Sequence, residues 1–161
     1  MRWAWIVLLG PLALVGCVEP QAALPLPELD VPFYQQHVHP IARWSCTALE
    51  CHGVEGRPLR LYSEDGLRAS GDLRGQPLSD FEASENALSF EGVDPVPRSV
   101  DEHTALTKPL SVDAGGLFHE GDDLWLDRAD PSYVCLRGWL AGELDVVAAC
   151  EQAERAIEPP P

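Results

Sequence analysis

The sequence predicts a small, mainly α-helical domain with long irregular loops. Three observations lead to this fold class. Helix-capping signals occur at several places along the chain. Fifteen prolines and 13 glycines among 161 residues imply short elements and long connections. Once an N-terminal segment is set aside, about 130 residues remain, which is enough for one small domain with a modest core.

The N-terminal segment has the features of an export signal. A single basic residue precedes an apolar run over residues 3–15, which is too short to span a membrane comfortably. The run ends in LVGC at residues 14–17, a sequence typical of a bacterial lipobox, in which Cys17 is lipidated and becomes the first residue of the mature chain. An ordinary signal peptide or an uncleaved anchor is the alternative reading.

The charge and the proposed lipidation together predict location and partners. The chain carries 26 acidic and 11 basic side chains, a net charge of −15. Such a surface repels nucleic acid and anionic headgroups, and favours either basic partners or simply solubility. We therefore expect a protein of the cell envelope that is anchored to the outer membrane by its lipid alone and binds no nucleic acid. The expected parts are a signal peptide at 1–16, a Pro-rich tether at 17–31, the domain at 32–150 and a disordered acidic, Pro-rich tail at 151–161.

Local signals place the helices. Asp30 can cap a first helix that has Pro32 near its start, and Pro40 should bend or end that helix. The stretches 79–82 and 99–102, SDFE and SVDE, both read as capping boxes that open short helices.

The strongest helix signal comes last in the chain. Asp130 is suited to the N-cap, Pro131 to the first helical position and Gly142 to the C-terminal stop. Between residues 53 and 98, glycines, prolines and acidic residues interrupt every pattern, so we expect a long irregular middle.

Apart from Cys17 the chain holds four cysteines, an even number that suits an oxidising compartment. Two disulfides would allow three connectivities. Cys135 lies on the last predicted helix, and the segment that ends in Cys150 could fold back along it, so we expect these two to be bonded. A buried free thiol at Cys135 is the alternative.

The stretch SCTALECHG at residues 45–53 holds the other pair, Cys46 and Cys51, with His52 directly after the second. A disulfide does not need that adjacent histidine. In a c-type haem site the two thiols form thioethers with the porphyrin, and the histidine reaches the iron beneath the ring. The usual spacing is CxxCH, whereas four residues separate the cysteines here. From these nine residues alone, covalent haem, a disulfide and a zinc site that would need further ligands all remain open.

Two longer stretches resemble the cytochrome c-like domains of secreted and lipid-anchored bacterial proteins. The first is FYQQHVHPIARWSCTALECHG, and the second is TALTKPLSVDAGGLFHEGDDLWLDRADPSYVCLRGWLAGE. The resemblance spans about residues 32 to 143 and is weakest in the middle. The chain departs from it in the four-residue spacer and in Glu120, where a glycine is expected. In the second stretch the matching residues are Lys108, Pro109, His119, Gly121, Trp125, Tyr133, Trp139 and Gly142. The resemblance implies a small cytochrome c-like helical domain with one haem c.

The sixth iron ligand follows from the composition. The only methionine is Met1, which would leave with the signal, so a methionine ligand is excluded. Among the histidines, His119 lies between glycines that would let the backbone approach a large planar ligand, although a solvated loop histidine is the alternative. His103 is expected at the surface, and His37 and His39 in packing or surface roles. We therefore expect His52 and His119 as the two axial ligands.

These features predict a monohaem electron-transfer lipoprotein that works with a redox partner protein. No nucleophile stands near a general base and no phosphate loop is present in the sequence, so we expect no enzyme. Two alternatives remain. One is a haem-free, disulfide-stapled lipoprotein that serves as a structural or binding module. The other is a haem with an open sixth site that binds a gas or reduces peroxide.

Overall fold

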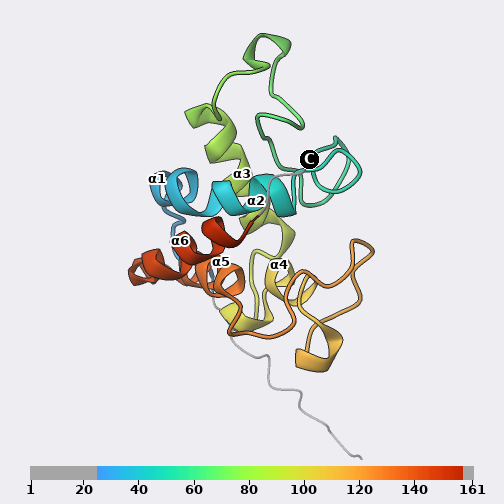
Figure 1. Cartoon of the computed structure of the whole chain (residues 1–161), viewed down its shortest axis with the longest axis vertical. Helices are drawn as coiled ribbons and strands as arrows, with labels where there is room; N and C mark the ends of the chain where they lie inside the picture. Colours follow the sequence, from blue (N-terminus) through green and yellow to red (C-terminus); the bar gives the residue numbers. More distant parts are fainter. Residues whose placement is uncertain (1–24, 158–161) are drawn as a thin grey trace, which may run out of the picture.

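The structure, a computed structural model, describes residues 25–157 and confirms a mainly helical domain (Figure 1). The signal peptide and Cys17 lie outside the described residues. The described part contains no β-strand, only two isolated bridges, Tyr62 with Leu67 and Leu110 with Trp125. The helices are α1 at Val31–Phe33, α2 at His39–Ser45, α3 at Asp80–Val93, α4 at Thr104–Thr107, α5 at Pro131–Ala141 and α6 at Val147–Ala156.

The first helical rod joins α1 to α2 through a turn of π-helix at Tyr34–Val38 and lies beside α5 and α6 (Figure 1). Its start is as predicted, because the Asp30 carboxylate accepts a hydrogen bond from the Phe33 amide at 2.8 Å. The sequence predicted that Pro40 would bend or end this helix, but the helix does not end there. The π turn places Pro40 in the first turn of α2, where its missing N–H is tolerated, and the helix continues to Ser45.

The middle of the chain is more ordered than expected. The predicted capping box at Ser79 is confirmed, since its hydroxyl accepts from the Glu82 amide and the Glu82 carboxylate accepts from the Ser79 amide. The helix it opens, α3, runs for 14 residues. The second predicted box is wrong. Ser99 makes no capping hydrogen bond and precedes only a short 3₁₀ turn, which ends at His103, the residue that caps α4.

The last predicted helix is confirmed as α5. The Asp130 carboxylate accepts from the Ser132 amide, Pro131 occupies the first turn, and Gly142 ends the helix with a φ of 71°. The chain then folds back as α6, which packs along α5. Because α6 continues to Ala156, residues 151–156 are helical, and the disordered tail predicted from residue 151 was wrong there.

The tether is shorter than predicted. Leu26 and Leu29 are partly buried against the core, and Val31 already belongs to α1. The indole N–H of Trp139, a fully buried residue, donates to the Asp30 carbonyl at 2.8 Å. These contacts anchor the end of the segment on the domain.

The core is built from aromatic residues on different helices. The rings of Tyr34 and Trp139 lie 5.1 Å apart, and Phe90 packs edge-on against Trp139 at 5.5 Å. Asn86 of α3 is buried, and its side chain bonds the Tyr34 hydroxyl as well as both backbone groups of Tyr62. The aromatic cluster therefore joins the first rod, α3 and α5, while Asn86 fixes the middle loop to α3.

The predicted Cys135–Cys150 disulfide is present and joins α5 to α6. Both half-cystines are buried. The bond closes a loop of 15 residues, for which chain-entropy estimates give about 3 kcal/mol of stabilisation.

The variant that carries both Cys135→Ala and Cys150→Ala should therefore unfold with a free energy lower by about 3 kcal/mol, measured by urea titration. Reductant should lower the stability of the wild type toward that of the variant and leave the variant unchanged. An equal urea midpoint for wild type and variant would contradict a stabilising bridge.

Candidate haem site

The loop that carries the CH pair begins where α2 ends. The Cys46 amide closes α2 on the Ala42 carbonyl, and the Cys46 carbonyl in turn accepts from the His52 amide at 3.0 Å. The longer spacer therefore turns outward and returns, so that His52 lies beside the residue that starts the loop. Gly53 is required here, because a Cβ at this position would lie 2.0 Å from the Thr47 carbonyl oxygen.

Both cysteines of this loop are free thiols and half-buried. The disulfide alternative for this pair is thus not formed in the structure. Burial, with a smaller effect of the neighbouring Cys51, raises the pKa of the Cys46 thiol to about 12. Cys46 is therefore protonated near neutral pH.

His52 is held by a single hydrogen bond of its ring. Its Nδ1 lies 2.8 Å from the Leu59 carbonyl oxygen, and since a carbonyl only accepts, Nδ1 carries the proton. The proton on Nδ1 leaves Nε2 with a lone pair. Burial, assisted by His119 and Arg57, lowers the pKa of His52, so the imidazole is neutral at neutral pH. A neutral ring with a free Nε2 is the form that binds a metal.

His119 is held in the same way on a separate loop. Its Nδ1 donates to the Asp122 carbonyl at 3.0 Å, and in the neutral form of the ring the lone pair is then on Nε2. The base of this loop is tied to the end of α4, where the Leu117 amide donates to the Thr107 carbonyl at 2.8 Å. The neighbouring Gly116 lies tightly against the backbone of Leu110, because a Cβ on Gly116 would lie 1.8 Å from the Leu110 carbonyl oxygen.

The fold brings these two imidazoles together. The ring centres of His52 and His119 are 6.1 Å apart, and the ring planes differ by 13°. Metal–imidazole bonds are about 2 Å long and the ring centre lies about 1 Å beyond the bonded nitrogen, so two imidazoles on opposite sides of one ion have centres about 6 Å apart. The rings are stacked nearly parallel, their centres have the spacing of two axial imidazoles of a haem iron, and neither Nε2 makes a hydrogen bond among the described residues.

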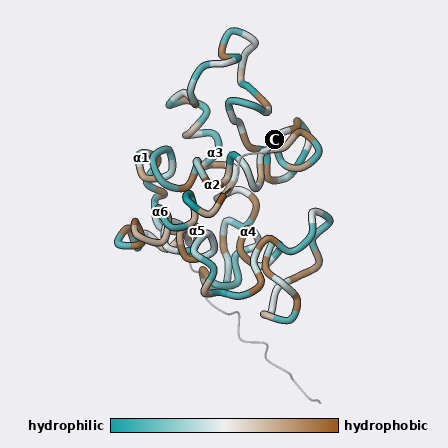
Figure 2. The backbone as a smooth tube through the Cα atoms, viewed as in Figure 1, coloured by the Kyte–Doolittle hydropathy of each residue, from teal (hydrophilic) through white to brown (hydrophobic). Residues whose placement is uncertain are grey.

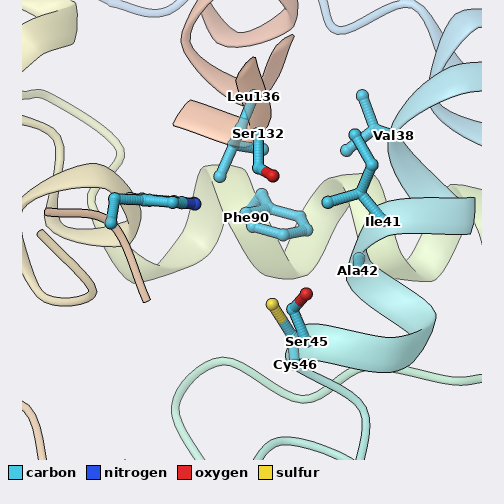
Figure 3. A pocket seen from close by; sticks show the side chains of 9 residues that line it. Val38, Ile41, Ala42, Ser45, Cys46, Phe90, Ser132 and Leu136 are labelled. Carbon is cyan, nitrogen blue, oxygen red and sulfur yellow. The ribbon is translucent and has the colours of Figure 1, made fainter. Parts of the chain in front are cut away.

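A small apolar cavity of about 20 Å³, large enough for about one water molecule, lies against Cys46. Figure 3 shows the Cys46 sulphur pointing toward the ring of Phe90 across this space, with Leu136 of α5 on the far side. Trp125 also lines the cavity. Its carbonyl accepts from the Ser111 amide, which connects the cavity wall to the start of the loop that carries His119.

Exposed apolar side chains flank both histidines. Leu49 and Val54 lie on the loop of His52, and Leu117 and Phe118 directly precede His119. Phe118 is 75% exposed. Figure 2 shows apolar stretches in these loops as well as in the helices. Exposed apolar side chains beside the two histidines are suited to contact with a large apolar ligand or partner.

The remaining histidines are engaged elsewhere. The His37 ring packs on Phe33 at 4.7 Å, and buried His39 bonds Glu64 through Nε2 at 2.9 Å, as the expected packing roles require. The prediction that His103 lies at the surface was wrong. It is fully buried, because it caps α4 from inside, with Nδ1 accepting from the Ala105 amide at 3.1 Å.

Backbone groups and one lysine complete the candidate site. The carbonyl groups of Leu59 and Asp122 orient the two rings, and backbone acceptors of this kind leave no signal in the sequence. Lys108, one of the residues that match the cytochrome c-like domains, donates through Nζ to the Phe118 carbonyl at 3.0 Å. Trp139 and Tyr133 are core residues, while Trp44 is exposed beneath Arg43.

Among residues 25–157, no group of three or more His, Cys, Asp or Glu side chains is placed to hold a metal ion by itself. In the same residues, no helix is long and apolar enough to cross a membrane. Searches of protein families, of curated proteins and of solved structures found no significant match to this chain.

Proposed function

We propose that the chain is a monohaem c-type cytochrome that transfers single electrons. Cys46 and Cys51 would carry the haem through thioethers, and His52 and His119 would ligate the iron. The observation that carries the proposal is the pair of imidazoles 6.1 Å apart, each with Nδ1 bonded to a backbone carbonyl. Surface histidines that serve no joint purpose need neither this spacing nor matching hydrogen bonds.

Haem iron, when bound, supplies the one-electron chemistry. The residues of the chain hold and orient it. His52 is neutral at neutral pH and needs to lose no proton to bind. The two carbonyl acceptors fix the ring orientations and make Nε2 of each ring a better donor. Two fixed ligands require little rearrangement between oxidation states, which suits electron transfer.

The same geometry favours haem over the alternatives. Zinc needs three or four protein ligands, whereas a porphyrin supplies four nitrogens itself and leaves only two positions for the protein. A haem with an open sixth site would require His119 to stand away from His52, which it does not. The Cys135–Cys150 bond is compatible with a haem-free stapled module, but that function gives no reason for the imidazole pair.

The proposal includes the setting of the protein. A lipid on Cys17 would hold the domain at the outer membrane in the cell envelope, and the redox partner would present a basic face to the strongly acidic chain. No contact with nucleic acid and no reaction on a substrate are part of this function.

The test is covalent attachment in full-length protein made with a haem-attachment system. The wild type should show a Soret band that survives acid–acetone extraction and a mass increased by one haem. Cys51→Ala should lose most of the covalent haem, because the thioether next to His52 holds the ring over its ligand. Cys46→Ala should retain a singly linked species.

The variant that carries both Cys135→Ala and Cys150→Ala is the control, since it removes cysteines away from the haem loop. The fraction of it that folds should still carry covalent haem, although its lower stability reduces the yield. Mass spectrometry that finds a Cys46–Cys51 disulfide and no haem in the wild type would reject the proposal.

A further inference from the structure

The turn from His119 to Asp122 has an unusual backbone. Asp122 has a φ of 65°, and it is the only residue other than glycine with a positive φ among residues 25–157. This left-handed conformation is disfavoured for residues with a Cβ, although Asp and Asn tolerate it better than most. The Asp122 carboxylate makes no hydrogen bond or ion pair within the described residues that would offset the cost.

The conformation has a local consequence for His119. It directs the Asp122 carbonyl back across the turn to within 3.0 Å of the ring Nδ1. Backbone strain of this kind persists where the surrounding structure imposes it, and it is concentrated at functional sites.

The neighbouring glycine leaves room for the ring. A Cβ on Gly121 would lie 3.1 Å from Cε1 and 3.5 Å from Nδ1 of His119, so the ring would have to move by a few tenths of an ångström. Gly121 has no positive φ, so its role here is space rather than backbone freedom. On the other side of His119, the Lys108 ammonium group donates a hydrogen bond to the Phe118 carbonyl.

We propose that Asp122 is a positioning residue for the sixth iron ligand, and that its left-handed backbone holds His119 with the proton on Nδ1 and with Nε2 free to coordinate. Gly121 supports this role by keeping the space beside the ring open. The inference rests on the proposed function, because it assigns a role within that site. Since the carbonyl makes the imidazole a stronger donor, the turn also favours ferric iron and lowers the reduction potential.

The test compares Asp122→Val with Asp122→Asn in the full haem-loaded protein. Valine strongly disfavours a positive φ, whereas asparagine tolerates it. In the reduced protein, nuclear magnetic resonance can follow exchange of the His119 Nδ1 proton with solvent. Loss of the hydrogen bond should speed this exchange about tenfold in the valine variant. The asparagine variant should match the wild type.

Two further readouts separate positioning from general damage. The valine variant should show a higher reduction potential and a partly high-spin ferric spectrum, with unchanged helix content, because the turn is exposed. Gly121→Ala should shift the spectrum in the same direction. Gly71→Ala is its control, since a Cβ at Gly71 meets no atom within 4 Å.

The failures of the two proposals are distinguishable. A wild type without covalent haem would reject the proposed function. In that case the ¹⁵N shifts of the His119 ring in the haem-free chain still show whether the proton is on Nδ1 in the wild type and is lost from it in Asp122→Val. Proton exchange, potential and spectrum that are the same in Asp122→Val and in the wild type would overturn the role of Asp122.

Discussion

Replacement of His119 by alanine is expected to convert the ferric iron from low-spin to high-spin and to let it bind cyanide, and in the ferrous state carbon monoxide, readily. The wild type should bind neither to a comparable extent, because both axial positions are filled by imidazoles. Its ferric spectrum should also lack the long-wavelength thioether band, since the only methionine is Met1. Absorption spectra with and without added ligand measure all three effects.

His37→Ala is the matched control for this substitution. His37 is also half-buried, but its ring packs on Phe33 in the first helical rod. The control should keep the low-spin spectrum. A His119→Ala protein that stays low-spin and refuses cyanide would clear His119 of the role and point to His39 or His103.

The structure explains why these two are poor substitutes. Nε2 of His39 is bonded to Glu64, and Nδ1 of His103 accepts from the Ala105 amide inside the core. Burial lowers the pKa of both rings, and for His39 this outweighs the opposing effect of Glu64. Neither ring can reach an iron at His52 without disrupting the packing around it. Two imidazole ligands should also give a lower potential than a histidine–methionine pair.

The parts of the fold that could be predicted depend on short-range contacts. The caps at Asp130 and Ser79 and the stop at Gly142 each require residues within four positions of one another. The Cys135–Cys150 bond could be predicted for a similar reason, because only a short connection separates α5 from α6, which packs back along it.

The errors concern features that distant residues decide. Pro40 is tolerated because a π turn precedes it, and no propensity of Tyr34–Val38 announces that turn. Ser99 has the residue pattern of a cap, but His103 takes over that role four residues later. The burial of His103 depends on the packing of the loop after α3, which the acidic residues Asp101 and Glu102 just before it do not reveal.

The candidate site shows the same division. His52 and the two thiols form a local pattern, and the need for Gly53 follows from a turn of a few residues. The approach of His119 to His52 closes a long loop between separate parts of the chain. The resemblance to cytochrome c-like domains, the lack of a methionine after the signal and the glycines around His119 suggested that pairing, whereas no local pattern did. The carbonyls that orient the rings and the strained backbone of Asp122 required the structure.

The largest expected loss of stability comes from Glu82, which is fully buried on α3. Its carboxylate accepts hydrogen bonds from the Arg68 guanidinium, from the Ala69 amide and from both the amide and the hydroxyl of Ser79. Arg68 is itself only 3% exposed in its side chain. Glu82→Gln would leave this buried guanidinium without a charged partner, and such changes typically cost about 3–5 kcal/mol. Urea unfolding at neutral pH measures the loss.

Glu85→Gln on the same helix is the matched control. Glu85 pairs with Arg60 at 3.1 Å, but about a third of each side chain is exposed, so its loss should cost less than about 1 kcal/mol. Equal destabilisation by the two substitutions would contradict the importance of the buried pair.

Acid provides an independent measure of the same carboxylate. Burial opposes its ionisation, but the bonds from Arg68, Ala69 and Ser79 outweigh burial and lower the pKa of Glu82 from 4.5 to about 2. The folded state thus binds this proton less readily than the unfolded state. The stabilisation is complete above pH 4.5 and is lost as the pH falls toward 2.

Stability between pH 4.5 and 2 should therefore fall more steeply in the wild type than in Glu82→Gln, which has no carboxylate to titrate. Parallel curves for the two proteins over this range would show that Glu82 titrates alike in the folded and unfolded chains.

The loss of Glu82 should also affect the candidate site. Glu82 binds the Ala69 amide of the middle loop to α3, and Phe90 of the same helix lines the cavity beside Cys46. Covalent haem yield in Glu82→Gln should fall in proportion to its lost stability, while Glu85→Gln should retain the wild-type yield.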